Sequence, residues 1–177
     1  MRPWFLAGLF FFGLLPLLAR LEDGYYSRKE PYFGYPVSAA ADGSVRLRND
    51  DYGDGYFGAS RNGGRRHEGI DFLAASGDPI YASKSGRVTH SAFEKGYGQY
   101  IELFHPDGLY TRYAHLSQLL LREGDWVKNG QVIGLAGKSG NARNAKILPH
   151  LHFEIRDNKQ ALDPTKGLLD PAIQLSL

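Results

Sequence analysis

From Gly64 onward the chain consists of short apolar runs of four to eight residues, separated by turns that contain glycine, without the period of a long helix. Short runs at close spacing are typical of antiparallel β-sheets. The sequence His105-Pro106-Asp107-Gly108, between two of the runs, is a hairpin turn signal. The expected strands are Ile70–Leu73, Pro79–Ala82, Gly86–Phe93, Gln99–Phe104, Leu109–His115, Gln131–Ala136 and Leu151–Arg156. The sequence therefore predicts an all-β domain, a single compact and mostly antiparallel sheet.

The last of these runs carries two histidines in alternation. His150 and His152 are two residues apart, and the residues between and after them are apolar. Because side chains on a strand repeat every second residue, both imidazoles point the same way while the apolar side chains point into a core. Taken alone, this pattern fits an edge strand with solvent-facing histidines as well as it fits a functional site.

A histidine and a carboxylate also stand four residues apart in His67-Glu68-Gly69-Ile70-Asp71. Gly69 and the β-branched Ile70 are poor helix formers, so we interpret the segment as a loop that runs into a strand. Asp71 then shares the direction of His67. This pattern is weak by itself, but it is much stronger when two alternating histidines follow some eighty residues later.

With these motifs in this order, the sequence resembles the lysostaphin-type zinc metallopeptidases, also called the LytM or M23 family. The resemblance covers Tyr56 to Arg156 and implies a fold related to the barrel-sandwich hybrid. Gly124 to Gly134 also resembles the turn of biotinyl and lipoyl carrier domains, but Lys128 lacks the flanking residues of a modification motif. The matching segments are residues 66–72, Gly77–Ala82, Gly86–Val88, Tyr113–Ser117, Gly124–Gly134 and the strand with His150.

Two imidazoles and one carboxylate form a donor set that suits Zn²⁺, with a fourth position left for water. The residues alone leave open which of His150 and His152 binds the metal. The resemblance implies that His67, Asp71 and His152 are the ligands of one Zn²⁺ per chain. It also implies that His115 and His150 stand beside the metal as catalytic residues.

Other polar residues near these motifs have two interpretations. Glu154 falls on the same strand face as the histidines, so it either orients an imidazole or lies in solvent. Glu68 alternates away from its histidine neighbour and is expected at the surface. His90 and His105 match no position of the family, and both are expected to be ordinary surface residues.

The loop from Ala142 to Leu148 is longer and more basic than the approach to the last strand that is common in the family. Arg143 and Lys146 lie in it, near the expected cleft. These two cations either contact a carboxylate of the substrate or are solvated.

The resemblance implies a zinc-dependent endopeptidase that hydrolyses peptide cross-links of bacterial peptidoglycan by attack of a zinc-bound water. The motifs leave open whether the bond lies in a glycine-rich bridge or between D-alanine and meso-diaminopimelate. The alternative is a non-catalytic LytM-like protein that activates cell-wall amidases or binds the wall. Such proteins are expected to lack one or more of the five site residues, and here all five are present.

The size of the chain fits one globular domain with a leader, because it has 177 residues, 42% of them hydrophobic. A formal net charge of only +2 gives no indication of nucleic-acid binding. The absence of cysteine excludes disulfides, thiolate ligands and lipid attachment through a thiol. Residues 63–177 are the expected metallopeptidase domain with a C-terminal tail. Residues 20–62, rich in Tyr, Gly and Pro, are an expected loop-rich connector with a short strand near Val45 to Leu47.

Residues 1–19 are expected to be a signal peptide or a membrane anchor. Pro3 to Ala19 carries no charge and lies between Arg2 and Arg20. Its 17 residues are at the lower limit for spanning a bilayer of about 30 Å. Pro16 favours cleavage after Ala19. The protein is therefore expected to be exported to the periplasm or cell envelope, with membrane contact only through an uncleaved N-terminal segment.

Overall fold

The computed structural model describes residues 24–26, 28–172 and 175–176, so the predicted leader at residues 1–19 lies outside the described residues. Among the described residues, no helix is long and apolar enough to cross a membrane. The strands are β1 Val45–Arg46, β2 Asn49–Asp50, β3 Gly53–Asp54, β4 Ile70–Leu73, β5 Pro79–Tyr81, β6 Gly86–Glu94, β7 Gly98–Phe104, β8 Tyr110–Leu116, β9 Gln118–Leu119, β10 Trp126–Val127, β11 Val132–Leu135, β12 His150–Asp157, β13 Gln160–Leu162 and β14 Leu175–Ser176, with 3-10 turns η1 Asn62–Gly64 and η2 Gly140–Arg143.

The predicted antiparallel all-β architecture is confirmed. The large sheet has the order β10-β6-β7-β8-β12-β13, and β4 pairs with β12 on the edge that β13 also uses. Every pairing within this sheet is antiparallel. The seven expected runs correspond to β4, β5, β6, β7, β8, β11 and β12, and the predicted turn at residues 105–108 connects β7 to β8. Strands of two or three residues, such as β9 and β10, are too short to leave a periodic pattern.

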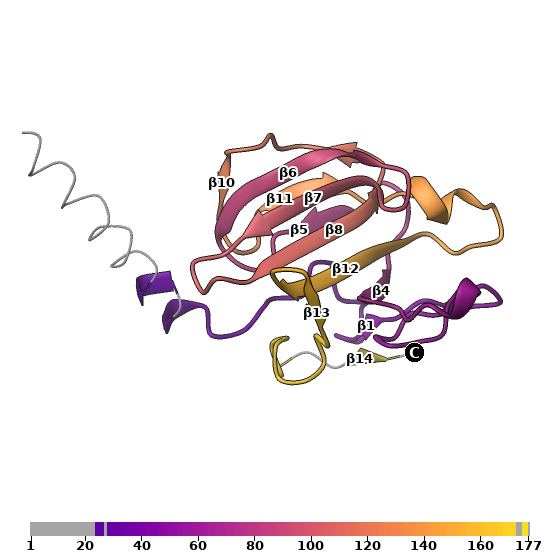
Figure 1. The fold of residues 1–177 in the computed structure, drawn as a ribbon. Coiled ribbons are helices and arrows are strands. Elements are labelled where there is room, and N and C mark those ends of the chain that lie inside the picture. The colour runs from indigo at the N-terminus through magenta and orange to yellow at the C-terminus, as the bar shows by residue number, and fades with distance from the viewer. Residues whose placement is uncertain (1–23, 27, 173–174, 177) are drawn as a thin grey trace, which may run out of the picture.

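A second sheet, β5-β11-β9, lies behind the large sheet in Figure 1. The inward side chains of both sheets belong to one hydrophobic cluster, with Ile80 and Ile133 from the small sheet and Ile101 and Phe153 from the large one. All four are 0% exposed. Burying such side chains contributes about 1.5–3 kcal/mol each, which makes this layer the main source of stability. The outward face of the large sheet is left for polar residues.

The segment before Asn62 contributes to the same core. Phe33, Val45 and Leu47 are buried in the main hydrophobic cluster. β1, which matches the expected short strand, pairs in parallel with β14 near the C-terminus. The strands in the described part of this segment, β1 to β3, have two residues each, so this part is rich in loops but packed on the domain.

The expectation that His105 is a surface residue is wrong. Its side chain is fully buried, and Nδ1 donates a hydrogen bond to the carbonyl oxygen of Ser85 at 2.9 Å. Nε2 lies 2.8 Å from the Thr111 hydroxyl, and the ring packs edge-on against Phe33. Residues distant in sequence cover the start of the turn, so the burial is not visible in the local pattern. His90, in contrast, is exposed as expected.

Candidate metal centre

The structure brings together the three side chains that were predicted to bind metal. Antiparallel pairing of β4 with β12 places Asp71 directly opposite His152, and His67 lies in the loop that enters β4, as predicted. Asp71 Oδ1 lies 2.9 Å from both His67 Nε2 and His152 Nδ1. The two nitrogens lie 3.0 Å from each other. Together the three atoms form a compact group that could hold one metal ion.

The second nitrogen of each ligand histidine fixes which nitrogen faces the group. His67 Nδ1 lies 2.7 Å from the carbonyl oxygen of Tyr56, which can only accept, so Nδ1 carries the proton. His152 Nε2 lies 2.9 Å from Glu154 Oε1 and donates to it. His67 Nε2 and His152 Nδ1 are therefore the nitrogens that face Asp71 Oδ1. When both lose their protons, three acceptors meet at one point, which a bound cation would satisfy.

Asp71 is held on its other side by two arginines that the sequence analysis did not identify. Arg48 donates to Asp71 Oδ2 from Nε at 3.2 Å and from Nη2 at 3.0 Å, and Arg61 Nη2 donates at 3.0 Å. Burial alone would raise the pKa of Asp71, but hydrogen bonds from His152 and His67 outweigh it and hold the pKa well below its usual value. The carboxylate thus stays ionised, with one oxygen left for the group.

The electrostatics of the group favour a bound positive charge. Burial lowers the pKa of His152, but its hydrogen bonds to Asp71 and Glu154 outweigh burial and raise the pKa to about 9. A buried imidazole that retains a second proton at neutral pH lies in a strongly negative environment. Nitrogen and oxygen donors in such an environment fit a divalent cation, and two imidazoles with one carboxylate suit zinc.

His115 and His150 lie beside this group, as predicted. Their rings are 5.1 Å apart, and His150 Nε2 lies 4.0 Å from Asp71 Oδ1. His115 Nδ1 donates to the carbonyl of Ser139, and His150 Nδ1 donates to the carbonyl of Leu148, so in both rings Nε2 is unprotonated. Burial lowers the pKa of His115 to about 3 and also lowers that of His150. Both rings are therefore neutral bases.

His115 reaches the site through a local irregularity of β8. Its backbone has φ 64, a left-handed conformation that residues other than glycine rarely adopt. The pairing of β7 with β8 shifts register between Gln99 and Ile101, whose partners are Leu116 and Tyr113. Two residues of β8 thus oppose one residue of β7, which is a β-bulge, and such bulges re-aim side chains beside active sites.

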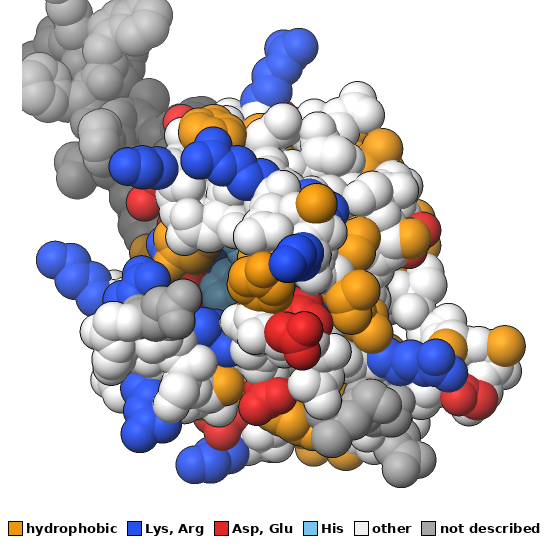
Figure 2. Space-filling view, turned by 90° about the vertical axis from the view of Figure 1, so that its right-hand side faces the viewer, with side chains coloured by type: hydrophobic (Ala, Val, Ile, Leu, Met, Phe, Trp, Pro, Cys, Tyr) orange, Lys and Arg blue, Asp and Glu red, His pale blue; other side chains and the backbone are white. Residues whose placement is uncertain are grey.

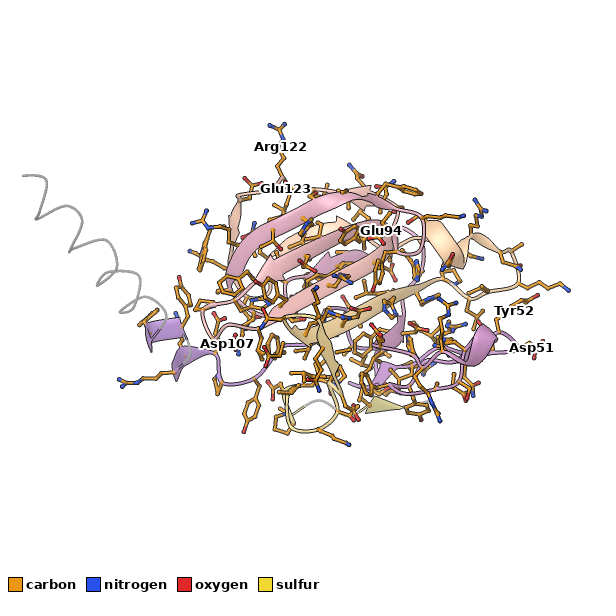
Figure 3. All side chains as sticks on the ribbon, in the orientation of Figure 1. Asp51, Tyr52, Glu94, Asp107, Arg122 and Glu123 are labelled. Carbon is orange, nitrogen blue, oxygen red and sulfur yellow. The ribbon has the colours of Figure 1, made fainter. Side chains whose placement is uncertain are left out.

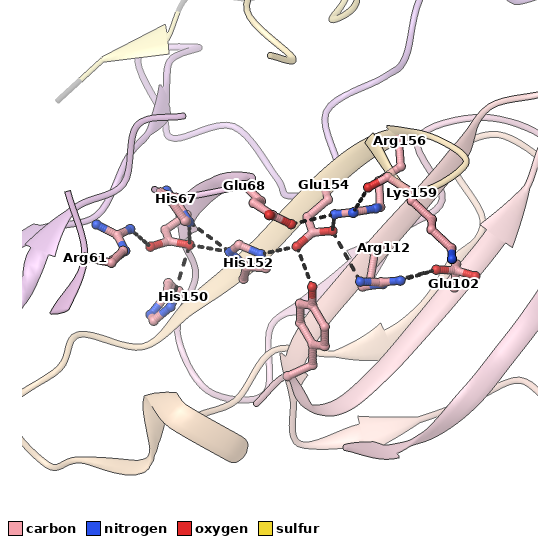
Figure 4. A network of polar contacts seen from close by, with 12 residues as sticks. Arg61, His67, Glu68, Glu102, Arg112, His150, His152, Glu154, Arg156 and Lys159 are labelled. Atoms are coloured by element: carbon pink, nitrogen blue, oxygen red, sulfur yellow. Dashed lines mark hydrogen bonds and ion pairs between the residues drawn. The ribbon is translucent and has the colours of Figure 1, made fainter. Parts of the chain in front are cut away.

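Behind His152, a network of buried charges extends along the outer face of the sheet (Figure 4). Glu154 is 1% exposed and accepts from His152, from the Tyr97 hydroxyl at 2.9 Å and from Arg156 at 2.6 Å. Arg112 lies between Glu154 and Glu102. Of the two interpretations of Glu154, the buried partner that orients an imidazole agrees with this geometry, and the solvated charge does not. Glu68 is exposed as expected and pairs with Arg156.

Arg143, the last residue of η2, and Lys146, in the loop that follows η2, are both exposed. The segment from Ser139 to Leu148 lies next to His115 and His150, since the Ser139 carbonyl accepts from His115 and the Leu148 carbonyl accepts from His150. Figure 2 shows histidine side chains in a hollow of the surface, bordered by hydrophobic and basic side chains. Both side chains are exposed, which fits either contact with a carboxylate of the substrate or simple solvation, so both interpretations stay open.

Sequence reasoning missed Arg48, Arg61, Arg112 and Tyr97. Arginine and tyrosine are common at protein surfaces, and nothing in the local pattern distinguishes these four. Alternation alone would point Arg112 away from His115, which is three residues later. Arg112 reaches the site because it lies directly opposite Glu154 in the register of β8 with β12.

The comparisons with known proteins agree with this geometry. Residues 65–164 match the model of peptidase family M23. DD-carboxypeptidase/endopeptidase Mpg of Neisseria meningitidis is 41% identical over 105 residues, which are 59% of this chain and 23% of Mpg. Peptidoglycan DD-endopeptidase ShyB of Vibrio cholerae is 36% identical over 110 residues, 62% of this chain and 25% of ShyB. The chain thus spans about a quarter of the length of these curated relatives.

Solved structures give the same result. A zinc-containing peptidase from Vibrio cholerae has a TM-score of 0.63 and 32% identity, covering 78% of this chain and 41% of that one. The catalytic domain of lysostaphin from Staphylococcus simulans has a TM-score of 0.56 and 35% identity, covering 68% of this chain and 92% of that domain. The family match extends over more than half of the sequence and includes all five predicted metal and catalytic residues. The chain belongs to peptidase family M23.

Proposed function

We propose that this protein is a zinc-dependent endopeptidase that hydrolyses peptide cross-links of bacterial peptidoglycan. The observation that carries the proposal is the convergence of His67 Nε2, His152 Nδ1 and Asp71 Oδ1 within 3.0 Å of one another, beside two neutral imidazoles. The relatives from Vibrio cholerae that are named peptidoglycan DD-endopeptidases, such as ShyB, support the substrate class.

These three atoms would hold one Zn²⁺ per chain. Bound there, Zn²⁺ supplies Lewis acidity, which polarises a carbonyl oxygen and lowers the pKa of water from about 15.7 towards about 7. Asp71 contributes the negative charge, and its two arginines keep the second oxygen away from the metal. Tyr56 and Glu154 hold the two imidazoles in the tautomers that ligation needs.

His115 and His150 provide the proton transfers of amide hydrolysis. Each offers an unprotonated Nε2, because its Nδ1 proton is donated to a backbone carbonyl. One imidazole accepts the proton of the attacking water at Nε2 and becomes an imidazolium. That proton then passes to the departing amine, directly or through Nε2 of the other imidazole, and an Nε2 that carries it can also stabilise the oxyanion. The family chemistry requires no serine or cysteine nucleophile.

We further propose the bond between D-alanine and meso-diaminopimelate as the target. This choice follows the DD-endopeptidase names of two relatives. Export to the periplasm or cell envelope is part of the proposal and is supported by the uncharged apolar run of Pro3 to Ala19. The alternative role as a non-catalytic activator or wall-binding protein has less support, since all five site residues are present and gathered at one site.

The decisive experiment measures metal content and muropeptide release on one sample. The chain from Arg20 onward is incubated with purified peptidoglycan of both cross-link types, with and without a chelator. We expect about one zinc per chain, chelator-sensitive cleavage and new ends at D-alanine and diaminopimelate. Cleavage that persists without metal would contradict the mechanism, and absence of both zinc and cleavage would favour the non-catalytic role.

A further inference from the structure

Arg48 binds two carboxylates at once, and only one of them belongs to the metal centre. Its Nε and Nη2 donate to Asp71, while Nη1 donates to Asp50 Oδ1 at 2.8 Å. The side chains of Arg48 and Asp50 are 5% and 9% exposed, so both charges are largely desolvated. A guanidinium with rigid donors on both edges fixes the relative position of the two carboxylates.

The second carboxylate oxygen of Asp50 binds the loop that precedes β12. Asp50 Oδ2 accepts from the backbone N–H of Leu148 at 3.0 Å, across 98 positions of the sequence. The carbonyl oxygen of Leu148 accepts from His150 Nδ1 at 2.7 Å. This N–H and carbonyl belong to one residue, so anchoring the N–H also restrains the carbonyl that orients the imidazole.

We infer that Asp50 is a positioning residue that, through Arg48 on one side and Leu148 on the other, fixes His150 relative to the metal ligand Asp71. The inference rests on the proposed function for its catalytic meaning. It explains how His150 Nε2, on a ring held by the loop before β12, stays 4.0 Å from Asp71 Oδ1. A base must be held this closely, because a displacement of about 1 Å can cost about 100-fold in rate.

The backbone around Arg48 is built for this contact. Arg48 N donates to the Asp71 carbonyl at 2.8 Å, and Gly55 exchanges hydrogen bonds with both residues. A side chain at Gly55 would lie 2.7 Å from the Asp71 carbonyl oxygen and 2.8 Å from that of Arg48, so only glycine permits this approach. The short β2 and β3 thereby present Asp50 to the site.

Arg48, Asp50 and Gly55 lie outside residues 65–164, the span that matches the family model, although the residues they hold lie inside it. The region before Arg65 therefore does more than cover the core, because two of its side chains bind residues of the site. A simpler role for Asp50 is to close its own turn, since Oδ1 also accepts from the Tyr52 N–H at 2.8 Å. The two roles differ in what they do to His150, which an experiment can measure.

The test compares Asp50→Asn and Asp50→Ala with the control Asp51→Asn. Asp51 is the adjacent carboxylate, exposed in the same turn near Tyr52 (Figure 3). An asparagine at 50 keeps the shape, but its NH₂ group must face either Arg48 or the Leu148 N–H, which are both donors, so one of the two bonds is lost. Each variant is assayed for zinc content, kcat and KM, and for the nitrogen chemical shifts of the His150 imidazole.

We expect wild type and Asp51→Asn to show one His150 tautomer, protonated at Nδ1. Both Asp50 variants should retain zinc but show an exchanging mixture of tautomers, with kcat lowered about 10-fold to 100-fold and KM changed less than about 3-fold. Asp50→Asn decides the outcome if Asp50→Ala does not fold.

A role in the turn alone would lower thermal stability while leaving the imidazole shifts and kcat at their wild-type values, and this result would overturn the inference. Failure of the proposed function has a different signature, namely a wild-type protein with neither zinc nor cleavage. In that case the imidazole shifts still decide whether Asp50 orients His150.

Discussion

His152 and His115 are both 8% exposed and lie on neighbouring strands, yet their protonation is opposite. Burial lowers the pKa of both side chains. For His152, hydrogen bonds to Asp71 and Glu154 outweigh burial and raise the pKa to about 9. For His115, the nearby His152 and His150 add to the effect of burial, and the pKa falls to about 3. Carboxylate partners, not depth, make the difference.

This contrast divides the site into two halves with different tasks. The ligand half, with two carboxylates around His152, is organised to hold a positive charge. The reactive half, in which His115 and His150 donate to backbone carbonyls, is organised to remain neutral and to accept a proton. Substitutions in the two halves should therefore have separable effects on metal binding and on turnover.

The largest effect is expected from His152→Ala. This change removes one of the three proposed ligands and leaves Asp71 and Glu154 without the imidazole that joins them. We expect loss of both zinc retention and peptidoglycan hydrolysis. Metal analysis after dialysis, together with muropeptide release, tests this prediction. Hydrolysis that persists in the variant would show that the metal assignment is wrong.

His115→Ala should separate the two halves. The ring packs against that of His152, with centroids 5.8 Å apart, but its hydrogen bond goes to the Ser139 carbonyl, so the variant should retain about one zinc per chain. Removing a general acid or base lowers the rate on the order of 10²-fold or more. Zinc content and kcat measured on the same preparation test this prediction, and zinc loss would move His115 into the ligand half.

Glu154→Gln should weaken the ligand half without abolishing it. The amide oxygen can still accept from His152 Nε2, but the negative charge that favours a cation is lost. Loss of such an outer partner typically lowers metal affinity 10-fold to 100-fold. Competition with a chromophoric chelator measures the affinity.

Glu102→Gln is the matched control for this variant. Glu102 also pairs with Arg112, is also buried and does not contact His152. Its substitution should leave zinc affinity unchanged. Equal loss in both variants would show that the whole charged network, and not the bond to His152, sets the affinity.

The strands and the common face of His150 and His152 could be predicted from local signals, whereas the gathering of all five site residues was implied by the family resemblance. Alternation along β12 places His150 and His152 on one face, and glycines mark the turns between strands. These signals act over a few residues and survive in any context. The antiparallel pairing of β4 with β12, which places Asp71 opposite His152, was not predicted.

The residues that hold the site residues in place could not be predicted, because their contacts join segments that are distant in the sequence. The hydrogen bond between Asp50 and Leu148 joins residues 98 positions apart in the sequence, and that between Arg48 and Asp71 joins residues 23 positions apart. Nothing in the composition around Arg48 distinguishes it from a solvated arginine. The error at His105 has the same origin, since Phe33 and Ser85 bury it from far along the chain.

His105 allows the comparison of His115 with His152 to be tested outside the site, and its substitution is expected to have the smallest effect. Burial lowers its pKa to about 4, as in His115, and no carboxylate hydrogen-bonds to it. Between pH 6.5 and about 4, the His105 imidazole binds a proton in the unfolded chain but stays neutral in the folded chain. The free energy of unfolding therefore falls as the pH falls through this window. Between pH 7.5 and pH 5, His105 alone is expected to lower the free energy of unfolding by about 2 kcal/mol.

Urea unfolding of wild type and His105→Gln at both pH values measures this loss of stability. Both proteins keep the metal centre, so its own pH dependence cancels. An equal pH dependence in the two proteins would mean that His105 accepts a proton in the folded state, as His152 does, and that burial without a carboxylate does not keep an imidazole neutral.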